Sequence, residues 1–209
     1  MNLDLFRAYL RSHPDEAYQR VLELRSQFTP LLFDEAPLRE NPLRHARQVT
    51  RYILWELERS GLSMNNVDPG HGPGHWVRDY LNALRIFSKS ELSSPHIIAG
   101  FIGGVLHDVG CTIVPRYDEK NTPLRHGEVM GLLFEDMCRS IQFIDLTPPE
   151  MQLVMWGIMA HTHYLAPQKV MWWEKEVVIE PYPDCDETGN PLFGIWLPRW
   201  VDRLECSGS

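Results

Sequence analysis

Cysteines are scarce in this sequence, and none of them lie close together. No Cys-x-x-Cys pair occurs among the four, which are Cys111, Cys138, Cys185 and Cys206. Wide separation of this kind argues against a zinc knuckle and against the disulfide framework of a small secreted protein. The sequence therefore predicts a chain that works in a reducing, cytoplasmic setting.

Positive charge and long apolar runs are also in short supply. Lys and Arg number 20 against 28 Asp and Glu, for a net charge of −8. A protein that binds nucleic-acid backbones needs a basic face, so no nucleic-acid polymer is expected as a partner. The longest apolar run, residues 97–106, contains three glycines. It is far shorter than the roughly 20 residues that cross a bilayer, so no membrane association is expected.

What the sequence does contain is a series of amphipathic or apolar segments with helical spacing. They predict an all-α helical bundle, with helices over residues 3–10, 17–28, 42–62, 75–87, 94–106, 122–137, 147–161 and 197–206. Ser94-Pro95 is a typical helix start, and Thr147 with Glu150 forms a capping box. Residues 176–181 and 191–196 flank a polar turn and predict a small β-hairpin insertion near the C-terminus. Residues 1–66 are expected to form an N-terminal helical cap on a core of residues 67–209, together one compact domain.

Several of the predicted helix ends carry a side chain of the kind that binds metals. These side chains are His75, His107, Asp108, His126, His161, His163 and, on the last helix, Asp202. A single histidine is more commonly an ordinary core or surface residue, so the prediction depends on the ordered set. Ligands contributed by several helices are how a helical bundle builds a metal site.

The chemistry of this set favours two divalent transition-metal ions. Imidazole and carboxylate ligands without thiolates suit iron, manganese or zinc, with iron or manganese favoured and cobalt or nickel compatible. A carboxylate such as Asp108 can bridge two ions about 3.5–4 Å apart, which clamp the attacking and leaving oxygens of a displacement. Burying His107 beside Asp108 is costly unless their lone pairs and charge are satisfied, and a metal satisfies both.

The same order of residues resembles the HD-domain superfamily of metal-dependent phosphohydrolases. The similar motifs are His75-Trp-Val-Arg-Asp79, Gly103-Gly-Val-Leu-His-Asp-Val-Gly110 and Trp200-Val-Asp-Arg-Leu-Glu205, and the resemblance covers about residues 70–205. It implies a first metal held by His75, His107, Asp108 and Asp202, with Asp108 as the bridging catalytic residue. It implies a second metal completed by His126 and His161. His163 stays open between an additional ligand and a hydrogen-bonded loop residue.

Two departures separate this chain from the HD-GYP branch of the superfamily. His163 is followed by Tyr164-Leu-Ala-Pro-Gln168 in place of a Gly-Tyr-Pro signature, and Cys111 stands where that branch usually has Lys. Both departures argue against a cyclic di-GMP phosphodiesterase.

Four cations are candidates for binding the substrate. Arg78 lies one helical turn after His75 and should share its face. Arg116, Lys120 and Arg125 lie between the His-Asp pair and His126, where they would bring positive charge to a phosphate. The alternative is a solvated loop whose cations pair with nearby acidic residues.

The resemblance thus implies a phosphohydrolase acting on a phosphomonoester or phosphodiester, with a small nucleotide-like molecule as the phosphorylated substrate. Divalent metals would supply the nucleophile by lowering the pKa of bound water. Two alternatives remain. Some relatives use the same ligands in a di-iron oxygenase that acts with O₂ on a hydroxylated substrate, and others are non-catalytic regulatory binding modules. The complete ligand set favours an enzyme, and a homodimer is compatible with the sequence.

Overall fold

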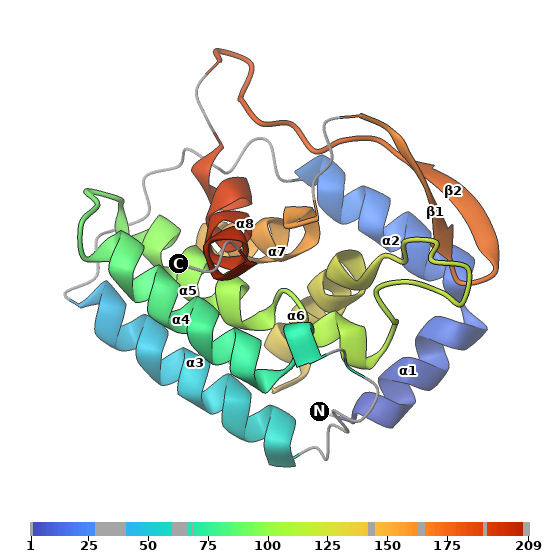
Figure 1. Ribbon diagram of the computed structural model, residues 1–209, viewed down its shortest axis with the longest axis horizontal. Helices are drawn as coiled ribbons and strands as arrows, with labels where there is room; N and C mark the ends of the chain where they lie inside the picture. The colour runs from blue at the N-terminus through green and yellow to red at the C-terminus, as the bar shows by residue number, and fades with distance from the viewer. Residues whose placement is uncertain are drawn as a thin grey trace.

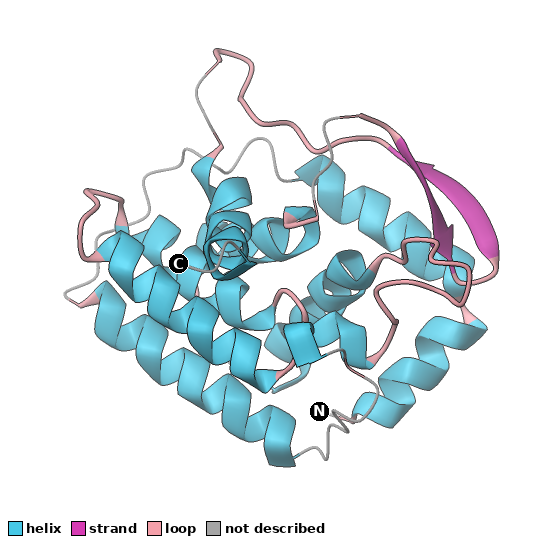
Figure 2. Cartoon of the chain, viewed as in Figure 1, coloured by secondary structure: helices cyan, strands magenta, loops and turns pink. Residues whose placement is uncertain are grey.

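The computed structural model describes residues 2–27, 41–59, 67, 69–141, 145–162, 166–189 and 192–206. In these residues the fold is all-α apart from one antiparallel two-stranded hairpin, as predicted (Figures 1 and 2). The elements are α1 Leu3–Ser12, α2 Pro14–Gln27, α3 Pro42–Arg59, the 3₁₀ turn η3 Pro69–His71, α4 Pro73–Phe87, α5 Ser94–Leu106, the 3₁₀ turn η4 Val109–Thr112, α6 His126–Ile141, α7 Pro148–Ala160, β1 Gln168–Trp172, β2 Lys175–Ile179 and α8 Phe193–Cys206. None of the described helices is long and apolar enough to span a membrane.

Helix α5 is the centre of the fold. Nearly all of its residues are buried, and it packs against α3, α4, α7 and α8. Glycines on α5 allow two of these helices to lie close to it. A methyl group at Gly100 would meet the ring of Phe87 at 2.1 Å, and one at Gly103 would meet Pro198 at 2.7 Å. The helix ends at Leu106 and is followed directly by His107 and Asp108, so the packing of α5 places this pair in the buried interior.

The N-terminal helices and the hairpin are attached to the rest of the fold by hydrogen bonds. The hairpin lies beside α2 in Figure 1, and the indole of Trp172 donates to the carbonyl of Pro14 at 2.8 Å. The Arg7 side chain of α1 donates to the carbonyl of Thr112 at 2.8 Å. Helix α3 contributes Ala46 to the same buried cluster as Phe101 of α5. The boundary predicted at residue 66 lies outside the described residues.

Two predicted elements were misplaced. The helix expected from Thr122 begins at His126, because the preceding residues pair elsewhere: the Thr122 amide donates to the carboxylate of Asp118 at 2.8 Å, and the Leu124 amide to the carbonyl of Arg116 at 2.9 Å.

The hairpin pairs Gln168–Trp172 with Lys175–Ile179, and not residues 176–181 with 191–196. Its turn includes Trp173 at a φ of 52°. Residues 193–196 form the first turn of α8. The capping box of α7 is present as predicted.

Candidate metal centre

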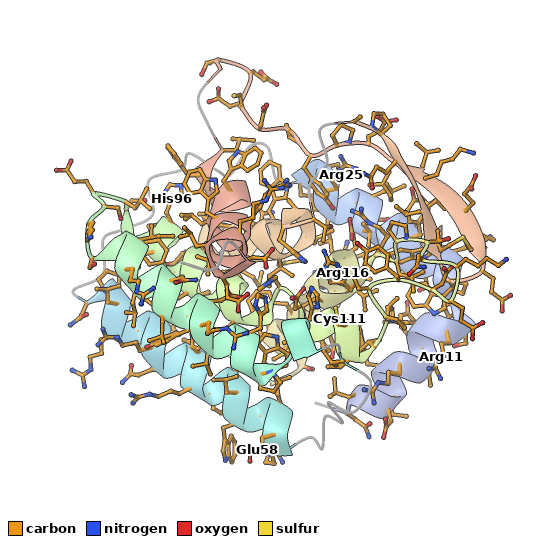
Figure 3. All side chains as sticks on the ribbon, in the orientation of Figure 1. Arg11, Arg25, Glu58, His96, Cys111 and Arg116 are labelled. Atoms are coloured by element: carbon orange, nitrogen blue, oxygen red, sulfur yellow. The ribbon has the colours of Figure 1, made fainter. Side chains whose placement is uncertain are left out.

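Helix termini bring the predicted ligands together in the interior. His75 lies in the first turn of α4, His107 and Asp108 at the end of α5, His126 at the start of α6, His161 at the end of α7 and Asp202 on α8. The side chain of Asp202 is 24% exposed, whereas the others are almost fully buried. In the view of Figure 3 the labels of Arg116 and Cys111 lie near the middle of the picture, while those of Arg11 and Glu58 lie at its edge, beside α1 and α3. His163 lies outside the described residues.

One group of donor atoms, here called the first lobe, surrounds the Nε2 atom of His75. That atom lies 3.2 Å from Asp108 Oδ2, 3.4 Å from Asp202 Oδ1 and 3.3 Å from His107 Nε2. Asp79 Oδ2 lies nearer still, at 3.0 Å. Sequence reasoning missed Asp79 as a candidate ligand, although its spacing of four residues from His75 places both side chains on one face of α4.

A second group, the second lobe, faces the other oxygen of Asp108. Its Oδ1 lies 3.2 Å from His126 Nε2 and 3.4 Å from His161 Nε2, and these two nitrogens are 3.0 Å apart. The carboxylate of Asp108 therefore presents one oxygen to each lobe. This is the geometry that a carboxylate needs to bridge two ions.

The outward-facing nitrogens of the histidines fix how the rings are oriented. The Nδ1 of His107 donates to the carbonyl of Gly104 at 2.8 Å, and the Nδ1 of His161 to the carbonyl of Ile158 at 2.6 Å. Because a carbonyl can only accept, the neutral form of each ring has its Nε2 lone pair directed into the cluster. Metal-binding histidines are typically oriented in this way.

The donor set fits metal ions. Three carboxylate oxygens in this cluster are buried and have only the imidazoles as hydrogen-bond donors beside them among the described residues. They are both oxygens of Asp79 and the Oδ2 of Asp108, and none accepts a hydrogen bond from a backbone amide or another side chain there. Burying several carboxylates together is unfavourable unless positive charge compensates them. Imidazole nitrogens and carboxylate oxygens suit divalent transition metals. These buried His and Asp groups could thus hold metal ions.

Carboxylates control the protonation of the first lobe. Burial alone would lower the pKa of His75, but Asp108 and Asp79 outweigh it and raise the pKa to about 10. His107 is fully buried, yet Asp108 and Asp202 raise its pKa to about 9. In the second lobe burial prevails and lowers the pKa of His161 to about 4. At neutral pH the metal-free protein therefore carries protons on both first-lobe imidazoles.

Metal affinity should consequently increase with pH. A metal ion must displace the Nε2 protons of His75 and His107, so about two protons should be released per first-lobe ion near pH 7. The stability of the metal-free fold should depend on pH in the opposite direction. The raised pKa values of His75 and His107 stabilise this fold fully below a pH of about 6.5, and the stabilisation is lost as the pH rises through 9 and 10. Calorimetric titration of Mn²⁺ in two buffers of different ionisation enthalpy measures the release. Binding without proton release would contradict this assignment of protons.

Cys111 is a second residue that the sequence reasoning did not assign to the cluster. Its Sγ belongs to a buried group with Asp108 and His126 whose donor atoms all lie within 4.8 Å of one another. The neighbouring Gly110 permits this packing, because a Cβ there would lie 2.0 Å from the carbonyl oxygen of His126. Turn η4 and the start of α6 therefore lie in direct contact.

The predicted substrate-binding cations have different surroundings. Arg78 forms an ion pair with Glu205, whose other oxygen lies 3.3 Å from His75 Nδ1. Arg125 is buried and forms an ion pair with Glu128.

The other two predicted cations, Arg116 and Lys120, are exposed. The guanidinium of Arg116 lies 2.7 Å from His71 Nε2, and the ring of His71 lies 5.9 Å from that of His75. Arg116 is thus an exposed cation that is linked to the cluster through another side chain, as the exposed Arg78 is linked through Glu205. Lys120 donates its backbone amide to Asp118 within the loop, at 2.8 Å.

In comparisons with known proteins, no family model, no curated protein and no solved structure matches this chain.

Proposed function

We propose that this protein is a metal-dependent phosphohydrolase of the HD type, acting on a small phosphomonoester or phosphodiester. The observation that carries the proposal is the pair of buried lobes joined by the carboxylate of Asp108, with one oxygen facing each lobe. When bound there, two divalent ions lower the pKa of water and neutralise charge on the phosphoryl oxygens.

The chain's own residues would fix the geometry of this reaction. Asp108 sets the separation of the two lobes, and the backbone hydrogen bonds of His107 and His161 hold their rings in place. Glu205 lies at the outward-facing Nδ1 of His75 and is itself held by Arg78. We infer from this arrangement that Arg78 positions His75 through Glu205. Preorganised ligands are what electrostatic catalysis requires.

Arg116 supports a phosphorylated substrate over a neutral one. It is exposed, and His71 connects it to the side of the first lobe formed by His75. A guanidinium in this position can bind a phosphate oxygen with charge-assisted hydrogen bonds. An oxygenase that acts on a neutral hydroxylated substrate needs no such cation.

The proposal predicts hydrolysis that does not need oxygen. Protein stripped of metal and reloaded with Mn²⁺ should hydrolyse 4-nitrophenyl phosphate or bis(4-nitrophenyl) phosphate at the same rate in air and under strict anaerobiosis. Mn²⁺ suits nitrogen and oxygen ligands. Oxygen consumption coupled to the loss of a hydroxylated substrate, with no hydrolysis under any metal, would instead identify an oxygenase.

The same assay tests whether Arg116 binds the phosphate of the substrate. Arg116→Gln should raise KM about tenfold, because a hydrogen bond to a charged group contributes about 1.5–3 kcal/mol. The comparison variant is Lys120→Gln, which removes an equal charge from the same loop and should raise KM less, because Arg116 is the one of the two that contacts His71 beside the cluster. Equal effects of the two variants would show that Arg116 has no specific contact with the phosphate.

A further inference from the structure

Asp79 has the surroundings of a metal ligand. It lies on α4 one turn after His75, and its side chain is completely buried. Its Oδ2 approaches two imidazole nitrogens, at 3.0 Å from His75 Nε2 and 3.7 Å from His107 Nε2. Two acidic side chains, those of Asp108 and Asp202, approach the same nitrogens. Asp79 therefore faces the centre of the first lobe.

The nitrogen that Asp79 faces distinguishes a ligand from an orienting carboxylate. A carboxylate that orients a metal-binding histidine contacts the ring nitrogen that points away from the metal. For His75 that position is taken by Glu205, which lies at Nδ1. Asp79 lies at Nε2, on the side where an ion would be held.

The spacing of the donor atoms fits a single ion. Bonds of about 2.1 Å place neighbouring ligands of an octahedral ion about 3.0 Å apart. One donor atom each from His75, Asp79, His107 and Asp202 lie within 4.8 Å of one another. The carboxylate oxygens of Asp79 and Asp202 lie 3.0 to 3.9 Å from the Nε2 atoms of His75 and His107. Side-chain shifts of less than about 1 Å would bring these donor atoms to the spacing of neighbouring ligands around one ion.

The charge of the first lobe is also compatible with a divalent ion bound to neutral imidazoles. The carboxylates of Asp79, Asp108 and Asp202 converge on the first lobe. Among the described residues, no hydrogen-bond donor besides the two imidazoles lies within reach of the Asp79 oxygens. Like charges this close strongly oppose burial. A divalent ion would offset most of their charge.

We propose that Asp79 is a further metal ligand and makes the two lobes unequal. The first lobe then offers one donor each from His75, Asp79, His107 and Asp202, which lie within 4.8 Å of one another. We assign the Oδ2 of Asp108, which lies beside the same two imidazoles, as its fifth donor. The second lobe offers two imidazoles and one oxygen of Asp108, with the thiol of Cys111 near Asp108 and His126. The first lobe binds a six-coordinate ion such as Mn²⁺ tightly and first, and the second lobe binds its ion later and more weakly. This inference rests on the proposed metal-dependent function and deepens it.

Titration with Mn²⁺ alone tests whether the two lobes differ in affinity. Electron paramagnetic resonance measures the concentration of free Mn²⁺ at each step. The wild-type protein should show two sites whose dissociation constants differ at least about tenfold. His126→Ala should remove the weaker site and leave the tight one. Adding Asp79→Asn to that variant should weaken the remaining site at least about tenfold, since even outer-shell partners contribute 10–100-fold to affinity.

The control in the same background is Asp136→Asn, which removes an exposed carboxylate of α6 and should leave the tight site unchanged. Unchanged affinity after Asp79→Asn, or equal weakening by both substitutions, would overturn the proposal. The titration contains no phosphate ester, so its outcome is independent of the hydrolysis assay.

A measurement on the unaltered protein covers the case in which the variants fail to fold. With one equivalent of Mn²⁺ bound, electron–nuclear double resonance in ¹⁷O-labelled water counts the water molecules on the ion. Five protein donors on an octahedral ion leave room for one water. One water or none is the expected result, and two or more would overturn the proposed first lobe of five protein donors.

Discussion

Replacing Asp108 by alanine should empty both lobes at once. Its two oxygens are the atoms that join the lobes: Oδ2 lies 3.2 Å from His75 Nε2, and Oδ1 lies 3.2 Å from His126 Nε2. Bound manganese should fall from about two ions per chain to well below one. Hydrolysis should fall at least about a thousandfold, because metals contribute several kcal/mol to transition-state stabilisation. Elemental analysis and the aryl phosphate assay measure the two effects.

The matched comparison is His161→Ala, which removes a donor from the second lobe only. It should lower the bound metal by about one ion and leave the first lobe filled. Far-UV circular dichroism of both metal-free variants shows whether the helices persist. Two retained ions in the Asp108→Ala protein would show that Asp108 does not bridge the lobes. Loss of both ions from the His161→Ala protein would show that the lobes are not separable.

The positions of the main ligands could be predicted because they depend on local signals. Ser94-Pro95 and the capping box of Thr147 and Glu150 fix where α5 and α7 begin, and each helix runs without interruption to a buried histidine. A helix start and a helical period are enough to place a residue at a helix end. No such local signal marks Asp79, since a carboxylate four residues after a histidine is equally common on a solvated helix face.

The partners of the cations could not be predicted, because they come from tertiary packing. Glu205 lies 127 residues after Arg78 in the chain, and no local pattern links the two. The same holds for the hairpin, whose Trp172 packs against Tyr18 of α2 and donates to Pro14. Strand preference depends on such packing more than on intrinsic propensity. The sequence therefore indicated that a hairpin exists but misplaced its strands.

A buried ion pair beside the second lobe gives the other large expected effect. Arg125 is 4% exposed and Glu128 is fully buried, and the hydroxyl of Tyr182 donates to the same carboxylate at 3.0 Å. Glu128→Leu should lower the free energy of unfolding by about 3–5 kcal/mol, because it leaves the buried guanidinium without its counter-charge. Urea denaturation of the metal-free protein measures the loss. Glu176→Gln, which breaks the exposed pair with Lys169, should have almost no effect.

The double variant Arg125→Met with Glu128→Leu separates a structural from a substrate-binding role of Arg125. Apolar side chains of similar size can replace a buried ion pair at little cost, so most of the lost stability should return. Arg125 directly precedes His126, and its side chain is directed to Glu128. We therefore expect the double variant to keep the wild-type KM for an aryl phosphate. A KM raised tenfold or more in a stable, metal-loaded double variant would instead assign Arg125 to the phosphate, as the sequence alone predicted.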